Sequence, residues 1–187
     1  MESNRYFFLY ILASVLLLPF ANMGMFLAGI NDEIASIDLI SFVQHLAICI
    51  SVAVAEELFF RGLLFREMVF SYNWQPVRAS VVVSIAFGSL HLLNVNSYAT
   101  CGFAIVQSIC AFAVSFNLCA IFINIKSLLW CIAIHAMINI TSIGFEGSAK
   151  GLQLLLSNLE SIIFLSVSFI YLVIGIKMFD NEMVEGK

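Results

Sequence analysis

Charged residues are scarce in this chain. Asp, Glu, Lys and Arg make up 11% of its 187 residues, against about 25% in an average soluble domain, whereas 62% of the residues are hydrophobic. This balance excludes an ordinary soluble globule, and 18 phenylalanines with so little charge exclude a disordered chain. The eight Lys and Arg residues, outnumbered by 12 Asp and Glu, also fail to supply the clustered cations that nucleic-acid binding requires.

The chain also lacks any paired cysteine motif. Its cysteines are odd in number, form no C-x-x-C pair and all lie inside apolar runs, at Cys49, Cys101, Cys110, Cys119 and Cys131. No basic residue adjoins them to favour a reactive thiolate. We therefore interpret them as small buried hydrophobic side chains rather than as a disulfide framework or a zinc site.

Long apolar runs are what the chain has instead. Six stretches contain no Asp, Glu, Lys or Arg: Tyr6–Ile30, Leu39–Ala55, Ala79–Leu93, Ala99–Ile125, Leu128–Ile143 and Ser161–Ile176. Because a helix needs about 20 mostly apolar residues to cross a bilayer, the first and fourth stretches qualify unaided and the others need polar end residues. We expect an all-α, polytopic membrane helix bundle of about six transmembrane helices, forming a single domain over residues 1–187.

The second stretch continues past two glutamates. Apolar residues follow as far as Phe70, so Leu39–Phe70 is predicted to be one long helical region. At 1.5 Å per residue this region would be about 48 Å long, which is more than a membrane is thick. Its later part must therefore tilt, bend or run along the interface.

The first stretch has two interpretations. Arg5 followed by Tyr6–Leu18 resembles the basic and apolar parts of a secretory signal, with Pro19–Met23 as a poor cleavage region. The apolar run nevertheless continues through Ile30, which is too long for the core of a signal peptide. We therefore favour an uncleaved first transmembrane helix.

The cations predict the orientation of the bundle. With six crossings, the N-terminus, the Arg61–Arg78 region, Lys126 and the C-terminus lie on one side and hold every Lys and Arg except Lys150. By the positive-inside rule both termini are expected to be cytoplasmic, with the acidic Asn31–Asp38 loop outside. The protein is thus expected to be an integral membrane protein in contact with membrane lipids.

Ionisable side chains at membrane depth are costly and indicate functional sites. Glu57 and Arg61 are four residues apart, the favourable spacing and order for an ion pair on one helix face. Glu56 has no such intrahelical cation, so it remains available as a general base. The alternative is an interfacial charge cluster that ends a transmembrane helix.

Two histidine motifs follow on later stretches. Phe87 and His91 share one helix face, with Gly88 permitting close approach of a neighbouring helix. His135 and Asn139 lie one turn apart and can donate to a single oxygen, as an oxyanion site in a water-poor environment requires. Taken singly, these residues are also compatible with hydrogen bonds that hold helices together, which is how we interpret the remaining histidine, His45.

The three motifs gain weight when their depths are compared. In the predicted topology Glu56, His91 and His135 can all meet in the cytoplasmic half of the bilayer. A carboxylate base, an imidazole and a pair of donors are the parts of a hydrolase that activates water.

The ordered motifs resemble those of a known family. Glu-Glu-Leu-Phe-Phe-Arg-Gly, Phe-Gly-Ser-Leu-His and His-Ala-Met-Ile-Asn, on successive apolar segments within Leu39–Ile143, are similar to the E-E-x-x-x-R, F-x-x-x-H and H-x-x-x-N patterns of the intramembrane glutamic endopeptidases. This CAAX protease and bacteriocin-processing family includes type II CAAX prenyl proteases and bacteriocin-immunity membrane proteins. The motif-bearing core is thus expected at about residues 39–143.

The resemblance implies a metal-independent membrane peptidase without a cofactor. Glu56 and His91 would activate a water, His135 and Asn139 would hold the oxyanion, and Glu57 and Arg61 would support the site. The partner would be a peptide or protein substrate: a bacteriocin, pheromone or leader peptide, or a membrane protein. The expected location is a bacterial plasma membrane. The resemblance does not fix the substrate or the oligomeric state.

Three alternatives stay open at this stage. In a metallopeptidase, Glu56, Glu57, His91 and His135 would be metal ligands, although the H-E-x-x-H spacing is absent and Asn139 would be an unusual ligand. In a non-catalytic immunity or scaffold protein, the same polar residues would only fasten helices together. A transporter would use them as a proton relay, but the sequence contains no inverted repeat.

Overall fold

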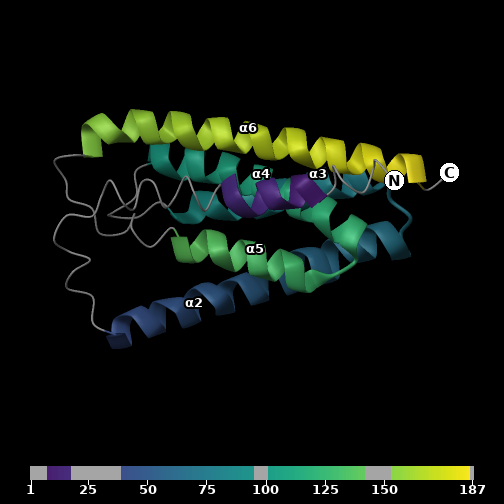
Figure 1. The fold of residues 1–187 in the computed structure, drawn as a ribbon, viewed down its shortest axis with the longest axis horizontal. Coiled ribbons are helices and arrows are strands. Elements are labelled where there is room, and N and C mark those ends of the chain that lie inside the picture. The colour runs from purple at the N-terminus through teal and green to yellow at the C-terminus, as the bar shows by residue number, and fades with distance from the viewer. Residues whose placement is uncertain (1–7, 18–38, 95–100, 142–152, 186–187) are drawn as a thin grey trace.

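The computed structural model describes residues 8–17, 39–94, 101–141 and 153–185, and these residues are predominantly helical (Figure 1). The main helices are α2 (Leu39–Glu57), α3 (Pro76–Leu90), α4 (Cys101–Ile125), α5 (Leu128–Thr141) and α6 (Gln153–Glu185), and a further helix covers Phe8–Leu17. The predicted all-α membrane bundle is therefore confirmed.

Four of the described helical runs are long and apolar enough to cross a membrane: Leu39–Ser71, Pro76–Leu93, Ala104–Ile125 and Ile162–Asp180. The other two, Phe8–Leu17 and α5, are apolar but shorter. The remainder of the first predicted stretch and the acidic loop lie outside the described residues. Each of the six predicted stretches thus contributes a helix, although the described part of two of them is shorter than a transmembrane span.

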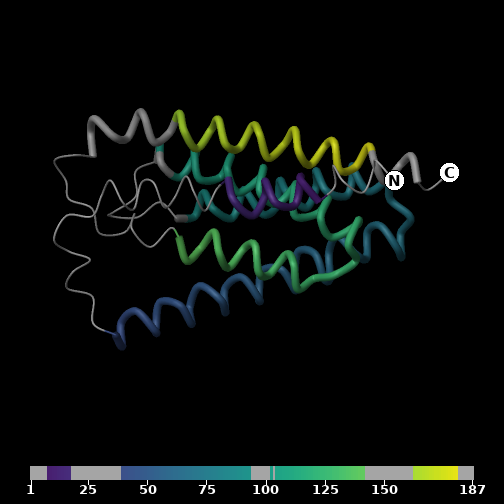
Figure 2. The backbone as a smooth tube through the Cα atoms, in the orientation of Figure 1, coloured from purple at the N-terminus to yellow at the C-terminus, as the bar shows by residue number. Residues whose placement is uncertain are grey.

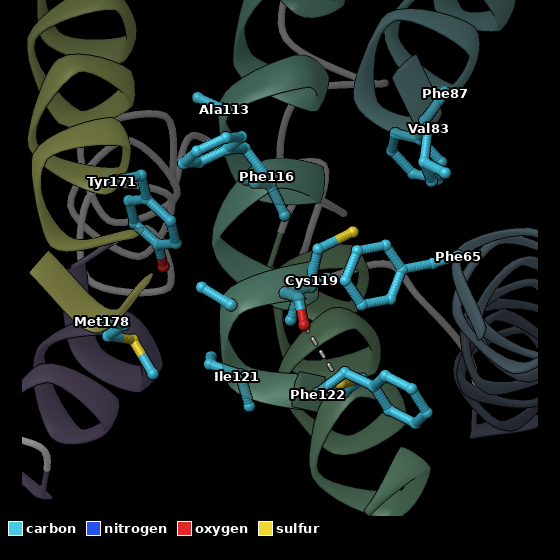
Figure 3. Close-up of a cluster of buried hydrophobic side chains, with 14 of the residues drawn as sticks. Phe65, Val83, Phe87, Ala113, Phe116, Cys119, Ile121, Phe122, Tyr171 and Met178 are labelled. Carbon is cyan, nitrogen blue, oxygen red and sulfur yellow. Dashed lines mark hydrogen bonds between the residues drawn. The ribbon is translucent and has the colours of Figure 1, made fainter. Parts of the chain in front are cut away.

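Helix α4 forms the centre of the bundle. It packs mainly against α3 and α6, and every residue from Ala113 to Ile123 is buried. Figure 3 shows side chains of α4 between Tyr171 and Met178 of α6 on one side and Phe65 on the other. Its burial explains why α4 is apolar all round, without a polar face.

A glycine allows α3 to approach α4 closely, as its place in the second motif predicts. A Cβ atom on Gly88 would lie 2.8 Å from the Ser108 carbonyl oxygen and 3.2 Å from the Phe112 Cβ atom. The Ser108 hydroxyl donates a hydrogen bond of 2.7 Å to the Gly88 carbonyl oxygen. Backbone contact and an interhelical hydrogen bond therefore fix the end of α3 that leads to His91.

Helix α2 is peripheral and packs chiefly against α5, which runs beside it in the opposite direction (Figure 2). Its helical run continues without a break from Leu39 to Ser71, as the apolar pattern predicts. Directly after Glu57, however, the backbone changes to π-helix over Leu58–Phe65 and again over Glu67–Ser71. π-helical turns are rare and frequently lie at functional sites.

Two connections lie at one end of the bundle (Figure 1). Asn73, between the π-helix and α3, and Lys126, between α4 and α5, both have the positive φ that often ends a helix. Arg66 and Arg78 lie on either side of the turn at Asn73, and the side chains of both arginines and of Lys126 are exposed. Of the cysteines, Cys49, Cys119 and Cys131 are buried, as predicted, and Cys110 is half-buried; all four are free thiols. The side chain of Cys101 lies outside the described residues.

Candidate active site

The predicted ion pair forms at the junction of α2 and the π-helix. Arg61 Nη1 donates a hydrogen bond of 2.8 Å to Glu57 Oε1, and both side chains are fully buried. A buried charge is tolerated only when it is paired, so each residue depends on the other. The i, i+4 spacing in the sequence identified this pair correctly.

His135 of α5 joins both glutamates. Its Nδ1 atom lies 2.8 Å from Glu57 Oε1, and its Nε2 atom lies 3.4 Å from Glu56 Oε2. Glu56 is the accessible member of this group, with 32% of its side chain exposed, whereas Glu57 is completely enclosed. The first and third sequence motifs therefore meet through one imidazole ring that faces two carboxylates.

The Phe87 ring links all three motifs. It packs edge-on against Phe60, its centroid lies 4.9 Å from that of His91 and 5.8 Å from that of His135, and Arg61 Cζ lies 5.1 Å from it. A guanidinium group and an aromatic ring at this separation attract each other. Phe87 is itself only 2% exposed, so it forms a fixed surface for the polar residues around it.

His91 begins the 3₁₀ turn His91–Asn94 that follows α3, and it is half-buried. Its Nδ1 atom lies 3.0 Å from the Phe87 carbonyl oxygen, which directs Nε2 away from that backbone group. Among the contacts of the described residues, His91 reaches the site through Phe87 and not through a carboxylate. The rings of His91 and His135 nevertheless both pack against the Phe87 ring.

The remaining predicted residues lie on the same two helices. Asn139 is half-buried on α5, one turn beyond His135. His45 is half-buried on α2, three turns before Glu56, and falls outside the cluster, in line with its assignment as a helix-packing residue.

The sequence motifs do not include every residue around the ion pair. Phe60 supports Phe87 from the π-helix, and the buried thiols of Cys119 and Cys131 lie close enough to Arg61 to interact with it electrostatically. Phe60 lies between Glu57 and Arg61 in the first motif, so its place in the sequence is a signal that could have identified it as a residue of the site. Nothing in the apolar runs around the two cysteines distinguishes them from ordinary core residues.

The described residues of the site do not form a metal-binding group. Among residues 8–17, 39–94, 101–141 and 153–185, no three His, Cys, Asp or Glu side chains form a group suited to hold a metal ion. The described donors are used in pairing instead: Arg61 bonds to Glu57, and His135 lies between the two glutamates.

Comparison with known proteins gives one match. Residues 38–141 match a family model described as type II CAAX prenyl endopeptidase Rce1-like. The matched segment begins at the start of α2, ends at the last residue of α5 and contains all six predicted site residues. No curated protein and no solved structure matches the chain.

Proposed function

Because the chain belongs to the type II CAAX prenyl endopeptidase Rce1-like family, a family of CAAX-type intramembrane proteases, we propose that it hydrolyses a peptide bond by a glutamate-dependent mechanism. The observation that carries this proposal is the partly exposed Glu56 carboxylate beside the buried group of His135, Glu57 and Arg61. A base that solvent can reach, next to a buried imidazole with fixed partners, suits the activation of water.

Glu56 is the general base of the proposed reaction. Its carboxylate takes one proton from a water molecule as the water oxygen bonds to the scissile carbonyl carbon, with His91 Nε2 orienting that water. His135 Nε2–H and the Asn139 amide donate hydrogen bonds to the resulting oxyanion. The Glu56 carboxyl then passes its proton to the leaving amine nitrogen as the C–N bond breaks, which balances the hydrolysis.

We propose that the reaction takes place in the cytoplasmic half of the membrane. Arg66 and Arg78, on either side of the turn at Asn73, and Lys126, between α4 and α5, are exposed cations at two connections that share one end of the bundle, and the positive-inside rule favours a cytoplasmic location for this end. Phe59, three residues after Glu56, and Met137, two residues after His135, are exposed large apolar side chains, which favours a substrate with apolar residues around the cleaved bond. We propose a bacteriocin, pheromone or leader peptide, or a membrane protein, as the substrate.

Comparative membrane peptidomics of cells with the wild-type protein or Glu56→Gln tests this function. One peptide boundary is expected to disappear in Glu56→Gln and to persist in the control Glu67→Gln, which changes an exposed acid on the same helical run. An unchanged set of boundaries in Glu56→Gln would contradict the proposal.

A packing variant separates catalysis from a scaffold or immunity role. Ala136→Leu enlarges a buried residue next to His135 without changing any charge. If Glu56→Gln leaves the cellular phenotype intact and only Ala136→Leu abolishes it, the polar residues serve helix packing and the peptidase proposal is wrong.

A further inference from the structure

A groove lies between α3 and α6, which both pack against α4. Its volume is about 280 Å³. The described residues that line it come from these three helices and the residue before α3: Gln75, Val77, Phe116, Ile176, Phe179 and Asp180. None of them is a predicted site residue, and α6 lies beyond the segment that matches the family, residues 38–141. The groove is therefore a feature separate from the candidate active site.

Two aromatic rings form the floor of this groove. Phe116 and Phe179 are both buried, and their ring centroids lie 5.3 Å apart in an edge-on arrangement. Gly175 makes room for the first ring, because a Cβ atom at this glycine would lie 2.8 Å from Phe116 Cδ1. The side chains of Val77 and Ile176 add apolar walls. Because pockets for drug-sized ligands begin at about 300 Å³, this smaller apolar space suits a slender hydrocarbon chain.

The groove crosses the boundary of the apolar spans. The span of α3 begins directly after Gln75, the span of α6 ends at Asp180, and the span of α4 ends beside it, at Ile125. Phe116 lies nine residues before Ile125, so the floor reaches about 13 Å below this boundary. One leaflet of the hydrocarbon core is about 15 Å thick. The groove is thus polar at the membrane surface and apolar over about the depth of one leaflet, which is the polarity profile of a phospholipid.

The polar edge of the groove offers a carboxylate and an amide. Asp180 is exposed and forms no ion pair within the part of the chain that the structure describes, and the exposed Gln75 side chain does not cap α3. A primary ammonium group carries a positive charge and three N–H donors for these acceptors. A quaternary ammonium group has the charge without the donors, and an anionic headgroup is repelled by the carboxylate. The exposed cations Arg78 and Lys177, each next to a lining residue in the sequence, suit the phosphate of the same lipid.

We propose that this groove binds one phospholipid with a primary ammonium headgroup, of the phosphatidylethanolamine type, from the leaflet at this end of the bundle. One acyl chain lies on the floor formed by Phe116 and Phe179, and the ammonium group donates hydrogen bonds to Asp180 and Gln75. The bound lipid joins α3 to α6, which each pack on α4. This inference does not depend on peptidase activity, so it can fail while the proposed function stands.

Native mass spectrometry of the full chain measures the choice of lipid. Delipidated protein in detergent is offered equal amounts of phosphatidylethanolamine, phosphatidylcholine and phosphatidylglycerol with identical acyl chains. We expect one bound phosphatidylethanolamine per chain, with phosphatidylcholine weaker and phosphatidylglycerol weakest. The affinities of the first and last should differ about 10- to 100-fold, the scale of a hydrogen bond to a charged group. Equal retention of the three lipids by the wild type would overturn the inference.

A charge variant tests the polar edge. Asp180→Asn should abolish the preference for phosphatidylethanolamine, because the carboxylate that attracts the ammonium group is lost. The control is Glu67→Gln, which removes another exposed acid that does not line the groove and should keep the preference. An unchanged preference in Asp180→Asn would contradict the inference, and the exposed position of this side chain makes a folding defect a poor explanation for its loss.

A steric variant tests the apolar part. Ile176→Phe narrows the groove and should weaken retention of phosphatidylethanolamine, whereas Ile162→Phe, the same change at an exposed position about four turns earlier on α6, should not. Equal retention in the two variants would show that the lipid lies elsewhere. If the wild type binds no lipid and forms a dimer that Ile176→Phe dissociates, a second copy of the chain covers the groove and the inference is wrong.

Discussion

The α2–α5 pair and the bundle around α4 are built by different means. The part of α4 from Ala113 to Ile123 is buried on all sides, and a glycine brings α3 into backbone contact with this helix. Between α2 and α5, buried charges hold the helices together through Glu57, Arg61 and His135. The comparison teaches that apolar packing suffices to hold the helices around α4, whereas the buried charges between α2 and α5 are stable only when each has its partner.

The largest expected effect is a loss of cleavage activity when Glu56, at the α2–α5 contact, is replaced. Glu56→Gln should lower the cleavage rate about 10²- to 10⁴-fold, the usual contribution of a general base, with little change in thermal stability because the side chain is partly exposed. Cleavage of a prenylated peptide with a C-terminal C-a-a-X sequence, a probe suited to the matched family, and thermal unfolding in detergent, measured on the same preparation, provide the check. Near-normal cleavage would remove Glu56 from the chemistry.

The next effect is on stability. Arg61→Met should lower the free energy of unfolding by about 3–5 kcal/mol, because it leaves the Glu57 carboxylate buried without its cation. The control is Arg66→Met, an exposed cation five residues further on, which should change stability little. Similar unfolding curves for the two variants would mean that the buried pair does not support the fold.

Close approach of the helices around α4 can be tested with two glycines. Gly88→Ala should destabilise the protein by about 1–3 kcal/mol, because the added Cβ would lie 2.8 Å from a backbone oxygen of α4. Gly62→Ala is the matched variant, since its Cβ would lie 3.4 Å from the flexible Leu128 side chain and 3.7 Å from the Glu57 carbonyl oxygen, which is an ordinary van der Waals contact. Chemical denaturation of both variants should rank Gly88→Ala as clearly the less stable.

The smallest expected effect comes from making the same substitution, phenylalanine to leucine, in each of the two regions. Phe87→Leu and Phe65→Leu should each cost about 1 kcal/mol of stability, as shape changes in a core usually do. Only Phe87→Leu should also reduce cleavage, since Phe65 packs against Phe122 whereas Phe87 packs against both site histidines. Equal activities in the two variants would show that Phe87 is only a core residue.

The sequence predicted features that depend on local spacing. The apolar runs predicted the helices, the i, i+4 spacing predicted the Glu57–Arg61 pair, and Gly88 predicted a close helix contact, because each is set by residues within one or two turns. The family resemblance, carried by the motifs, agrees with the matched family.

Other features depend on packing between distant segments. His135 and Glu57 are 78 residues apart, and nothing in either motif shows that one imidazole contacts both glutamates. The π-helix was also beyond prediction, because its hydrogen-bond register leaves no distinct apolar pattern. Phe87 could be placed on a face with His91, but its contacts with Arg61 and His135 required α2 and α5 to be in position. The catalytic roles of Glu56, His91, His135 and Asn139 remain predictions.

The turn at Lys126 has a consequence for the supply of water. Lys126 is exposed and α5 begins at Leu128, whose side chain already contacts the π-helix at Gly62. His135 is only seven residues into α5, about 10 Å along its axis. Since an ammonium group must stay hydrated, this turn belongs at the membrane surface, so water should be available about 10 Å along the α5 axis from His135. A peptidase consumes one water in each turnover, and this short distance shortens the route by which that water is replaced.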